Sequence, residues 1–215
     1  MIIEKYGILL RRLTQEDLEL VRVKRNEDSV RDFMFYKKII TPEEQQIWFE
    51  SINNIHNYYL IIEVDGKKVG MINGKNIDYD NRTSEGGIFF WDAEYRNGLI
   101  ASLASIILAD FTFLLFEFNK TYAEVLASNK GQIQYNEFMG YELEKAEGEK
   151  LLYVLTRKNY LKKRGRIVKA VQQLTKDKSE ITWQDLNLSG SCKEDIKKLY
   201  DGLPSYVQHG LNQIL

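Results

Sequence analysis

The sequence contains very little cysteine, histidine and proline: one, two and two residues in a chain of 215. A single cysteine, Cys192, excludes an internal disulfide. The two histidines, His56 and His209, lie far apart and have no Cys or His at ligand spacing, so we expect no metal site. Glycine-rich phosphate loops of the dinucleotide and nucleoside-triphosphate types are absent, which argues against both of those folds.

Long apolar stretches and an excess of one charge are also missing. The apolar run at residues 103–108 is far too short to span a bilayer, and the start M-I-I-E-K-Y-G does not resemble a signal peptide. A net charge of −1 provides no footprint for nucleic acid or an anionic membrane. With the single cysteine, these absences predict a cytoplasmic protein.

The composition that remains is that of a globular chain, with 44% apolar and 28% charged residues. We expect a main domain over residues 1–160 and a small helical extension over 161–215. Thr182-x-x-Asp185 and Ser191-x-x-Glu194 are spaced as helix starts, and Pro204 separates a last segment. The balanced charge of this extension favours packing or a homodimer contact over DNA binding.

Local signals predict the order of secondary structure. Thr14 to Asp17 has capping-box spacing, and Thr41-Pro42 places a cap before a proline at the first helical position. A turn over residues 65–66 joins two strands, and Gly140 ends a helix. We expect strands over residues 8–13, 58–64, 68–75, 85–91, 122–126 and 150–156, a polar turn over 76–84, and helices after Thr14 and Thr41 and over 99–117 and 130–139. This order predicts a mixed α/β (α+β) fold.

Two segments in this order carry a family resemblance. Residues 96–101 read R-N-G-L-I-A between a strand and a helix, and Asn129-x5-Tyr135-x4-Gly140-Tyr141 follows downstream. Over roughly residues 6–158 the chain resembles the GNAT superfamily of acyl-CoA-dependent N-acyltransferases. The family's acyl-CoA loop reads Arg/Gln-x-x-Gly-x-Gly/Ala. Residues 96 and 101 match it, whereas Leu99 replaces a glycine and Gly98 comes one position early.

The resemblance implies a GNAT-like, mostly antiparallel central sheet flanked by helices, with acyl-CoA as co-substrate and no metal. The strand at 85–91 would splay from the strand at 122–126, and backbone N–H groups near residues 89–91 would stabilise the oxyanion. The residues that the resemblance assigns to acyl-CoA are Phe89, Phe90, Trp91, Arg96, Asn97, Gly98, Leu99, Ile100, Ala101 and Asn129. Asn129 has the simpler alternative of capping a helix.

Two residues are candidates for proton transfer. Tyr135 matches the family's tyrosine near the thioester sulfur, where its hydroxyl would protonate the leaving thiolate. Glu85 begins the strand beside the expected thioester, and we expect it to act as the base, directly or through water. Its alternative is a solvated carboxylate, because a sugar amine needs little help to lose a proton. An acyl-cysteine route is disfavoured, since Cys192 has no neighbouring histidine.

The first half of the chain points to a subgroup. Arg25-Asn26, Val30-Arg31, Met34-Phe35-Tyr36 and residues 40–49 resemble GNAT enzymes that acylate nucleotide-linked deoxyamino sugars, used in bacterial surface polysaccharides and glycans. The acceptor would contact Arg25, Arg31, Tyr36 and His56, while Phe33 and Trp48 are expected in the core. Two alternatives remain open: a ribosomal-protein-type N-terminal acetyltransferase, and a GNAT-like module that binds acyl-CoA without turnover.

Overall fold

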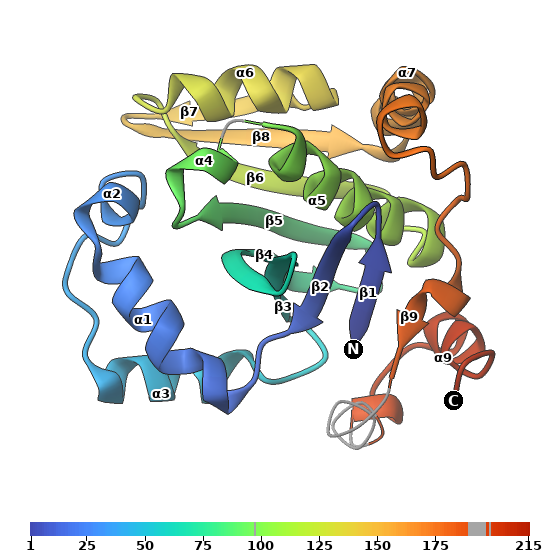
Figure 1. The fold of residues 1–215 in the computed structure, drawn as a ribbon, viewed down its shortest axis with the longest axis horizontal. Helices are drawn as coiled ribbons and strands as arrows, with labels where there is room; N and C mark the ends of the chain where they lie inside the picture. Colours follow the sequence, from blue (N-terminus) through green and yellow to red (C-terminus); the bar gives the residue numbers. More distant parts are fainter. Residues whose placement is uncertain (97, 189–196, 198) are drawn as a thin grey trace.

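A computed structural model of the chain describes every residue except 97, 189–196 and 198 (Figure 1). Its centre is a nine-stranded sheet with the order β7-β8-β6-β5-β4-β3-β2-β1-β9. All neighbouring strands are antiparallel except β5 and β6. The strands are β1 (Ile2–Lys5), β2 (Ile8–Arg12), β3 (Tyr58–Val64), β4 (Lys67–Asp78), β5 (Thr83–Phe90), β6 (Lys120–Leu126), β7 (Glu142–Glu147), β8 (Lys150–Thr156) and β9 (Leu186–Asn187). This arrangement confirms the mixed, mostly antiparallel fold.

Helices cover both faces of the sheet. One face is packed by α5 (Leu99–Asp110), α6 (Lys130–Met139) and α7 (Arg157–Thr175). The other is packed by α1 (Leu18–Asn26), α2 (Asp28–Arg31) and α3 (Pro42–Ile52), which gather at one end of the molecule (Figure 1). No described helix is long and apolar enough to cross a membrane.

Caps and turns begin and end these elements as their sequences predict. The Thr41 side chain accepts a hydrogen bond from the Glu44 backbone N–H, and the Glu44 carboxylate accepts one from Thr41 N–H, which completes a capping box. Gly140 ends α6 in the left-handed conformation, with φ 98°. The β3–β4 turn places Asp65 and Gly66 at φ 50° and 75°.

Several boundaries differ from the prediction. Thr14 opens a short 3₁₀ turn, η1 (Gln15–Asp17), before α1 begins. The helix expected over 99–117 is α-helical only to Asp110 and continues as the π-helical segment η2 (Phe111–Leu115). Strand β4 extends to Asp78 and shortens the predicted polar turn, and the strands β1 and β7 were not predicted. β1 is four residues long with one buried apolar residue, Ile3, and β7 is wholly exposed, so neither carries an apolar pattern long enough to predict a strand.

The C-terminal segment is joined to the same core. Helix α7 runs through residues 160 and 161, where the sequence predicted a division, and then η3 (Trp183–Asp185) leads into β9. Strand β9 pairs with β1, so the segment is not purely helical. α9 (Ser205–Leu211) begins directly after Pro204, and its Val207 and Leu211 join the main hydrophobic core. The helix start predicted at Ser191 and Glu194 lies outside the described residues.

Candidate active site

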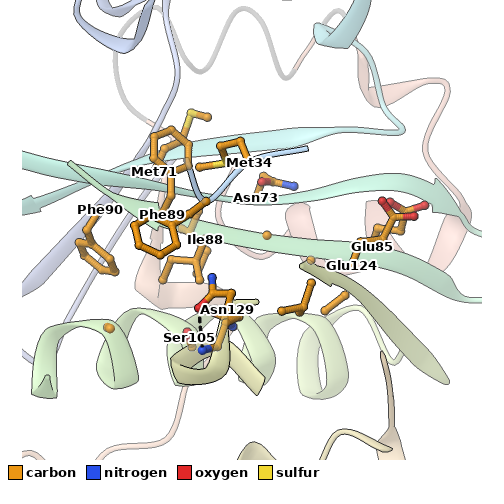
Figure 2. A pocket seen from close by; sticks show the side chains of 18 of the residues that line it. Met34, Met71, Asn73, Glu85, Ile88, Phe89, Phe90, Ser105, Glu124 and Asn129 are labelled. Atoms are coloured by element: carbon orange, nitrogen blue, oxygen red, sulfur yellow. Dashed lines mark hydrogen bonds between the residues drawn. The ribbon is translucent and has the colours of Figure 1, made fainter. Parts of the chain in front are cut away.

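A cavity of about 1450 Å³ opens where β5 and β6 part. The two strands pair in parallel only as far as Glu85 and Tyr122, and the remainder of β5 diverges from β6, as the sequence predicted. The cavity reaches both faces of β5. Figure 2 shows Met34, Met71 and Asn73 on one side of this strand, and Ser105 and Asn129 on the other.

The backbone of β5 presents hydrogen-bonding groups to the gap. Trp91 N–H donates to Val69 O at 3.1 Å and is therefore committed to β4. Because successive residues of a strand direct their N–H groups to alternate sides, Phe89 also faces β4, whereas Ile88 and Phe90 face the gap. Among the oxyanion donors predicted near residues 89–91, only Phe90 N–H faces the gap; Ile88 N–H, just before that range, faces it too.

The N-terminus of α5 provides a place for an anion on the same side. The N–H groups in the first turn of a helix have no intrahelical acceptor, and in α5 no capping side chain accepts from them either. Gly98 lines the cavity, and a Cβ there would meet no atom within 4 Å. Leu99, which stands in a glycine's place, leaves 46% of its surface exposed and does not line the cavity. The leucine that replaces the expected glycine therefore does not fill the space at the N-terminus of α5.

Arg96 lines the cavity close to this helix start. Its Nε donates to Phe90 O at 3.0 Å, while Nη2 is buried and has no hydrogen-bond partner. Its guanidinium also lies over the Phe33 ring, 5.8 Å from the centroid. Arg96 thus retains an unused donor that suits a phosphate oxygen. Asn97, the next residue of the predicted loop, lies outside the described residues.

Tyr135 of α6 places its hydroxyl in the cavity. The hydroxyl is buried and has no partner that meets hydrogen-bond geometry. Burial raises the pKa of Tyr135 to about 12, an effect that the nearby hydroxyls of Ser105 and Ser102 oppose in part. The side chain is therefore a neutral donor at physiological pH, which is the protonation state required of a general acid.

Asn129 begins α6, and its side chain accepts a hydrogen bond from Gln132 N–H at 3.1 Å. The structural role that the sequence allowed, a helix cap, is thus present. Asn129 also lines the cavity on the α5 side of β5 (Figure 2).

Glu85 lies on β5 at the point where the strands part. Its Oε1 accepts from Asn76 Nδ2 at 2.9 Å, and its Oε2 lies 2.9 Å from Lys75 Nζ. Burial would raise the pKa of Glu85, but Asn76 and Lys75 outweigh it and lower the pKa below the ordinary value of 4.5. Glu85 is therefore an ionised and weakened base. Figure 2 shows Glu124 beside it, and Glu124 is in turn paired with Lys150.

On the opposite face of β5, α1 and the segment after α2 cover a second part of the cavity. The Arg25 guanidinium lies 5.9 Å from the Phe89 ring centroid, and its Nη1 is buried without a hydrogen-bond partner. Burial lowers the pKa of Arg25. Tyr36 and Phe33 also line this part; Phe33 is 51% exposed, so its predicted core position is wrong. Trp48 packs partly buried against Tyr59, as expected.

Five predicted site residues have side chains outside the cavity: Trp91, Leu99, Ile100, Arg31 and His56. Trp91 is buried and its indole donates to Lys68 O at 2.8 Å. Ile100 packs on the core. Arg31 is held by Asn26 O and Asp28 within its own turn, and His56 Nδ1 contacts Ile77 O at 2.7 Å. The other predicted site residues that the structure describes do line the cavity: Arg25, Tyr36, Glu85, Phe89, Phe90, Arg96, Gly98, Ala101, Asn129 and Tyr135.

The sequence prediction missed three buried amides in the cavity: Asn136 on the acyl-CoA side, and Gln45 and Asn73 on the acceptor side. A signal was present for each of the two on the acceptor side. Gln45 stands three residues before Trp48 on the packed side of α3, and Asn73 stands two residues after buried Met71 on β4. A polar residue at an apolar position of a periodic pattern indicates a partner within the fold or a ligand.

The described residues contain no group of three His, Cys, Asp or Glu side chains that could hold a metal ion. The cavity instead offers single polar groups on an aromatic and aliphatic wall, which is typical of a small-molecule site.

Comparisons with known proteins agree with this geometry. Residues 8–142 match the family model described as "Acetyltransferase (GNAT) domain". Spermidine N(1)-acetyltransferase of Escherichia coli (strain K12) is 25% identical over 142 residues, covering 65% of this chain and 75% of that protein. The structure of spermidine N-acetyltransferase from Vibrio cholerae with CoA and spermine has a TM-score of 0.65 at 18% identity, covering 73% and 99% of the two chains. A domain from Methanocaldococcus jannaschii DSM 2661 has a TM-score of 0.59 at 22% identity, covering 69% and 97%.

Proposed function

Since the family model matches more than half of its residues, the chain belongs to the GNAT acetyltransferase family, and we propose that its acceptor is a nucleotide-linked deoxyamino sugar. It is an acyl-CoA-dependent N-acyltransferase, and acyl-CoA is its co-substrate. The observation that carries the choice of acceptor is the half-buried Arg25 side chain, whose Nη1 is buried without a hydrogen-bond partner in the part of the cavity covered by α1.

A buried N–H of a cationic group that lacks a hydrogen-bond partner is costly, and an anionic ligand that accepts from it removes that cost. No carboxylate that lines the described cavity is correspondingly unpartnered and available to a cationic ligand. Glu85 and Glu124 are paired with Lys75 and Lys150, and Glu44 accepts the Thr41 N–H in its capping box. This charge distribution favours an acceptor that carries a pyrophosphate over a polycation.

The donor side fits acyl-CoA on this chain's own groups. The N-terminus of α5, Gly98 and the free Nη2 of Arg96 would hold the pyrophosphate. Backbone groups of β5 that face the gap would bind the pantetheine arm, and the N–H groups of Ile88 and Phe90 would receive the oxyanion.

In the proposed reaction, the acceptor amine attacks the thioester carbonyl directly in a ternary complex. The C–N bond forms, and the C–S bond breaks after the tetrahedral intermediate. Tyr135 donates its hydroxyl proton to the leaving thiolate, and Glu85 accepts the amine proton through water. Proton return from Glu85 to Tyr135 through solvent restores both groups.

A second candidate acceptor is a polyamine. The observation in its favour is the similarity to the E. coli enzyme named spermidine N(1)-acetyltransferase. At 25% identity that similarity supports the chemistry of acyl transfer to an amine more strongly than it supports the acceptor. The unpartnered Arg25 is a cation in the acceptor part of the cavity and would repel a polyamine.

The test is an acceptor panel with acetyl-CoA, in which free thiol and product mass are followed. The panel holds dTDP- and UDP-linked amino sugars, spermidine, and a peptide with a free N-terminus. Turnover of a nucleotide-linked amino sugar at a kcat/KM well above that of spermidine is expected. Turnover of spermidine or the peptide alone would reject the proposed acceptor. If none of the acceptors in the panel causes thiol release, the transferase activity itself is contradicted.

A further inference from the structure

Buried polar atoms without partners concentrate in the cavity. Among the described residues, six residues that line it have a buried side-chain nitrogen or oxygen with no hydrogen-bond partner: Arg25, Gln45, Asn73, Arg96, Tyr135 and Asn136. Arg96, Tyr135 and Asn136 belong to α4 (Ala93–Arg96) and α6, on the acyl-CoA side. Arg25, Gln45 and Asn73 belong to α1, α3 and β4, on the acceptor side.

Gln45 and Asn73 are more than nine-tenths buried, at 4% and 8% exposure. Their unpartnered atoms are Nε2 and Nδ2, which are both N–H donors. Native proteins pair nearly all buried polar groups, so two unpaired amides facing one cavity indicate groups that a ligand satisfies.

A chain of contacts brings these two amides to one surface. Gln45 lies one helical turn before Trp48, whose ring packs edge-on against Tyr59 with centroids 5.1 Å apart. Tyr59 is paired directly with Asn73 across β3 and β4. The surface from α3 to β4 is therefore continuous, and Figure 2 shows Asn73 between the Met34–Met71 cluster and Glu85.

Gly87 keeps room for Asn73 on the other side. It is paired with Asn73 across β4 and β5, and a Cβ at Gly87 would lie 2.9 Å from Asn73 Oδ1. Such a contact would displace the amide from the cavity. The absence of a side chain at this position thus preserves the orientation in which Nδ2 faces the ligand space.

We propose that Gln45 and Asn73 determine acceptor specificity by donating hydrogen bonds to oxygen atoms of the acceptor. The unpartnered buried atoms here, Gln45 Nε2, Asn73 Nδ2 and Arg25 Nη1, are all N–H donors, which suit the hydroxyl, carbonyl and phosphate oxygens of a nucleotide-linked sugar. A polyamine carries N–H donors and positive charge, and it would leave all of these groups unpaired. This inference rests on the proposed function and extends it to two residues of unassigned role.

The test uses Gln45→Met and Asn73→Leu in the full chain, with Gln46→Met on the same helix as the matched control. We expect each test variant to raise the KM for the amino-sugar acceptor by roughly 10- to 100-fold, because a polar site that loses a donor discriminates by about this factor. The dissociation constant for acetyl-CoA should stay within about twofold, since the amides lie on the opposite side of β5. The melting temperature should be unchanged or higher, because each variant removes an unpaired buried amide.

The isosteric substitution Asn73→Asp, which introduces a negative charge, adds a second readout. It replaces a donor with an anionic acceptor of the same shape, so the ratio of kcat/KM for the amino sugar to that for spermidine should fall. A merely structural role for Asn73 would change both substrates alike.

Unchanged acceptor KM in Gln45→Met and Asn73→Leu would overturn this inference and leave the proposed function standing. A lowered melting temperature with equal loss on all acceptors would overturn it in favour of a structural role. Wild-type protein that acylates spermidine but no nucleotide-linked amino sugar would overturn the proposed function, and the inference with it.

Discussion

Arg164 of α7 and Asp110 at the end of α5 form a bidentate ion pair, with Nε–Oδ1 2.6 Å and Nη2–Oδ2 3.1 Å. Asp110 is 1% exposed, and its Oδ1 also accepts the Tyr160 hydroxyl at 2.7 Å. The helix whose N-terminus faces the proposed pyrophosphate site is thus anchored at its other end by the C-terminal segment.

Arg164→Met should destabilise the fold by about 3–5 kcal/mol, because it leaves the Asp110 carboxylate buried with less compensation. Urea unfolding followed by circular dichroism measures the change. Arg166→Met provides the control, since Arg166 is exposed on the same helix. A loss below about 1 kcal/mol, the level of a surface pair, would contradict the anchoring role.

Tyr135→Phe should lower kcat by about 100-fold or more with little change in the KM for acyl-CoA, as expected when a general acid is removed. The matched control is Tyr153→Phe, a buried tyrosine of β8 outside the cavity. Because the acid form of Tyr135 persists up to its pKa of about 12, its titration should not appear in the wild-type rate profile between pH 6 and pH 10. Unchanged turnover in Tyr135→Phe would remove the general-acid assignment.

Glu85→Gln should reduce kcat by about tenfold, at the weak end of general-base effects, because a carboxylate of low pKa is a poor base. Glu85 accepts a proton only when ionised, and its pKa is lowered from 4.5, so the wild-type rate should lose this contribution only as pH falls below about 4.5. The measurement is kcat against pH for both proteins with a saturating acceptor. Equal kcat at neutral pH would show that the amine needs no help from Glu85.

Arg25→Met should raise the KM for the nucleotide-linked acceptor by roughly 10- to 100-fold, the size expected for a hydrogen bond to a charged group. Arg25→Lys should recover part of that loss, because it keeps the charge but not the planar fork of donors. Arg31→Met is the control, since Arg31 lies outside the cavity and is bound within its own turn. If both arginine-to-methionine variants behave alike, the acceptor does not depend on Arg25.

Much of the donor half of the site follows from contiguous sequence. Residues 96–101 lie between β5 and the start of α5, and Asn129 to Tyr135 lie at the start of α6, directly after β6. The residue spacing within each segment therefore predicts which of its side chains lie near the cavity. The exceptions have local causes. Leu99, Ile100 and Ala101 are the first three residues of α5, and their side chains point in different directions around the helix. Of these three, only Ala101 lines the cavity.

The acceptor half was predicted less well because its residues come from distant elements. Arg25 and His56 were both predicted to contact the acceptor, but α1 packs over β5, whereas His56 lies in the loop after α3 and contacts Ile77 O. Gln45 and Asn73 are separated by 28 positions (73 − 45) and share a cavity only because α3 packs on the sheet.

Local sequence specifies the capped starts of η1 at Thr14 and α3 at Thr41, the 65–66 turn, the left-handed stop at Gly140, and the order of β2, β3, β4, β5, β6 and β8 along the chain. Each depends on hydrogen bonds and dihedral preferences within a few residues. Long-range packing leaves polar atoms of Arg25, Gln45 and Asn73 without partners, and it pairs β9 with β1 at the end of the sheet. The physical reason is that burial and strand pairing are relations between segments far apart in the chain, and local composition does not contain them.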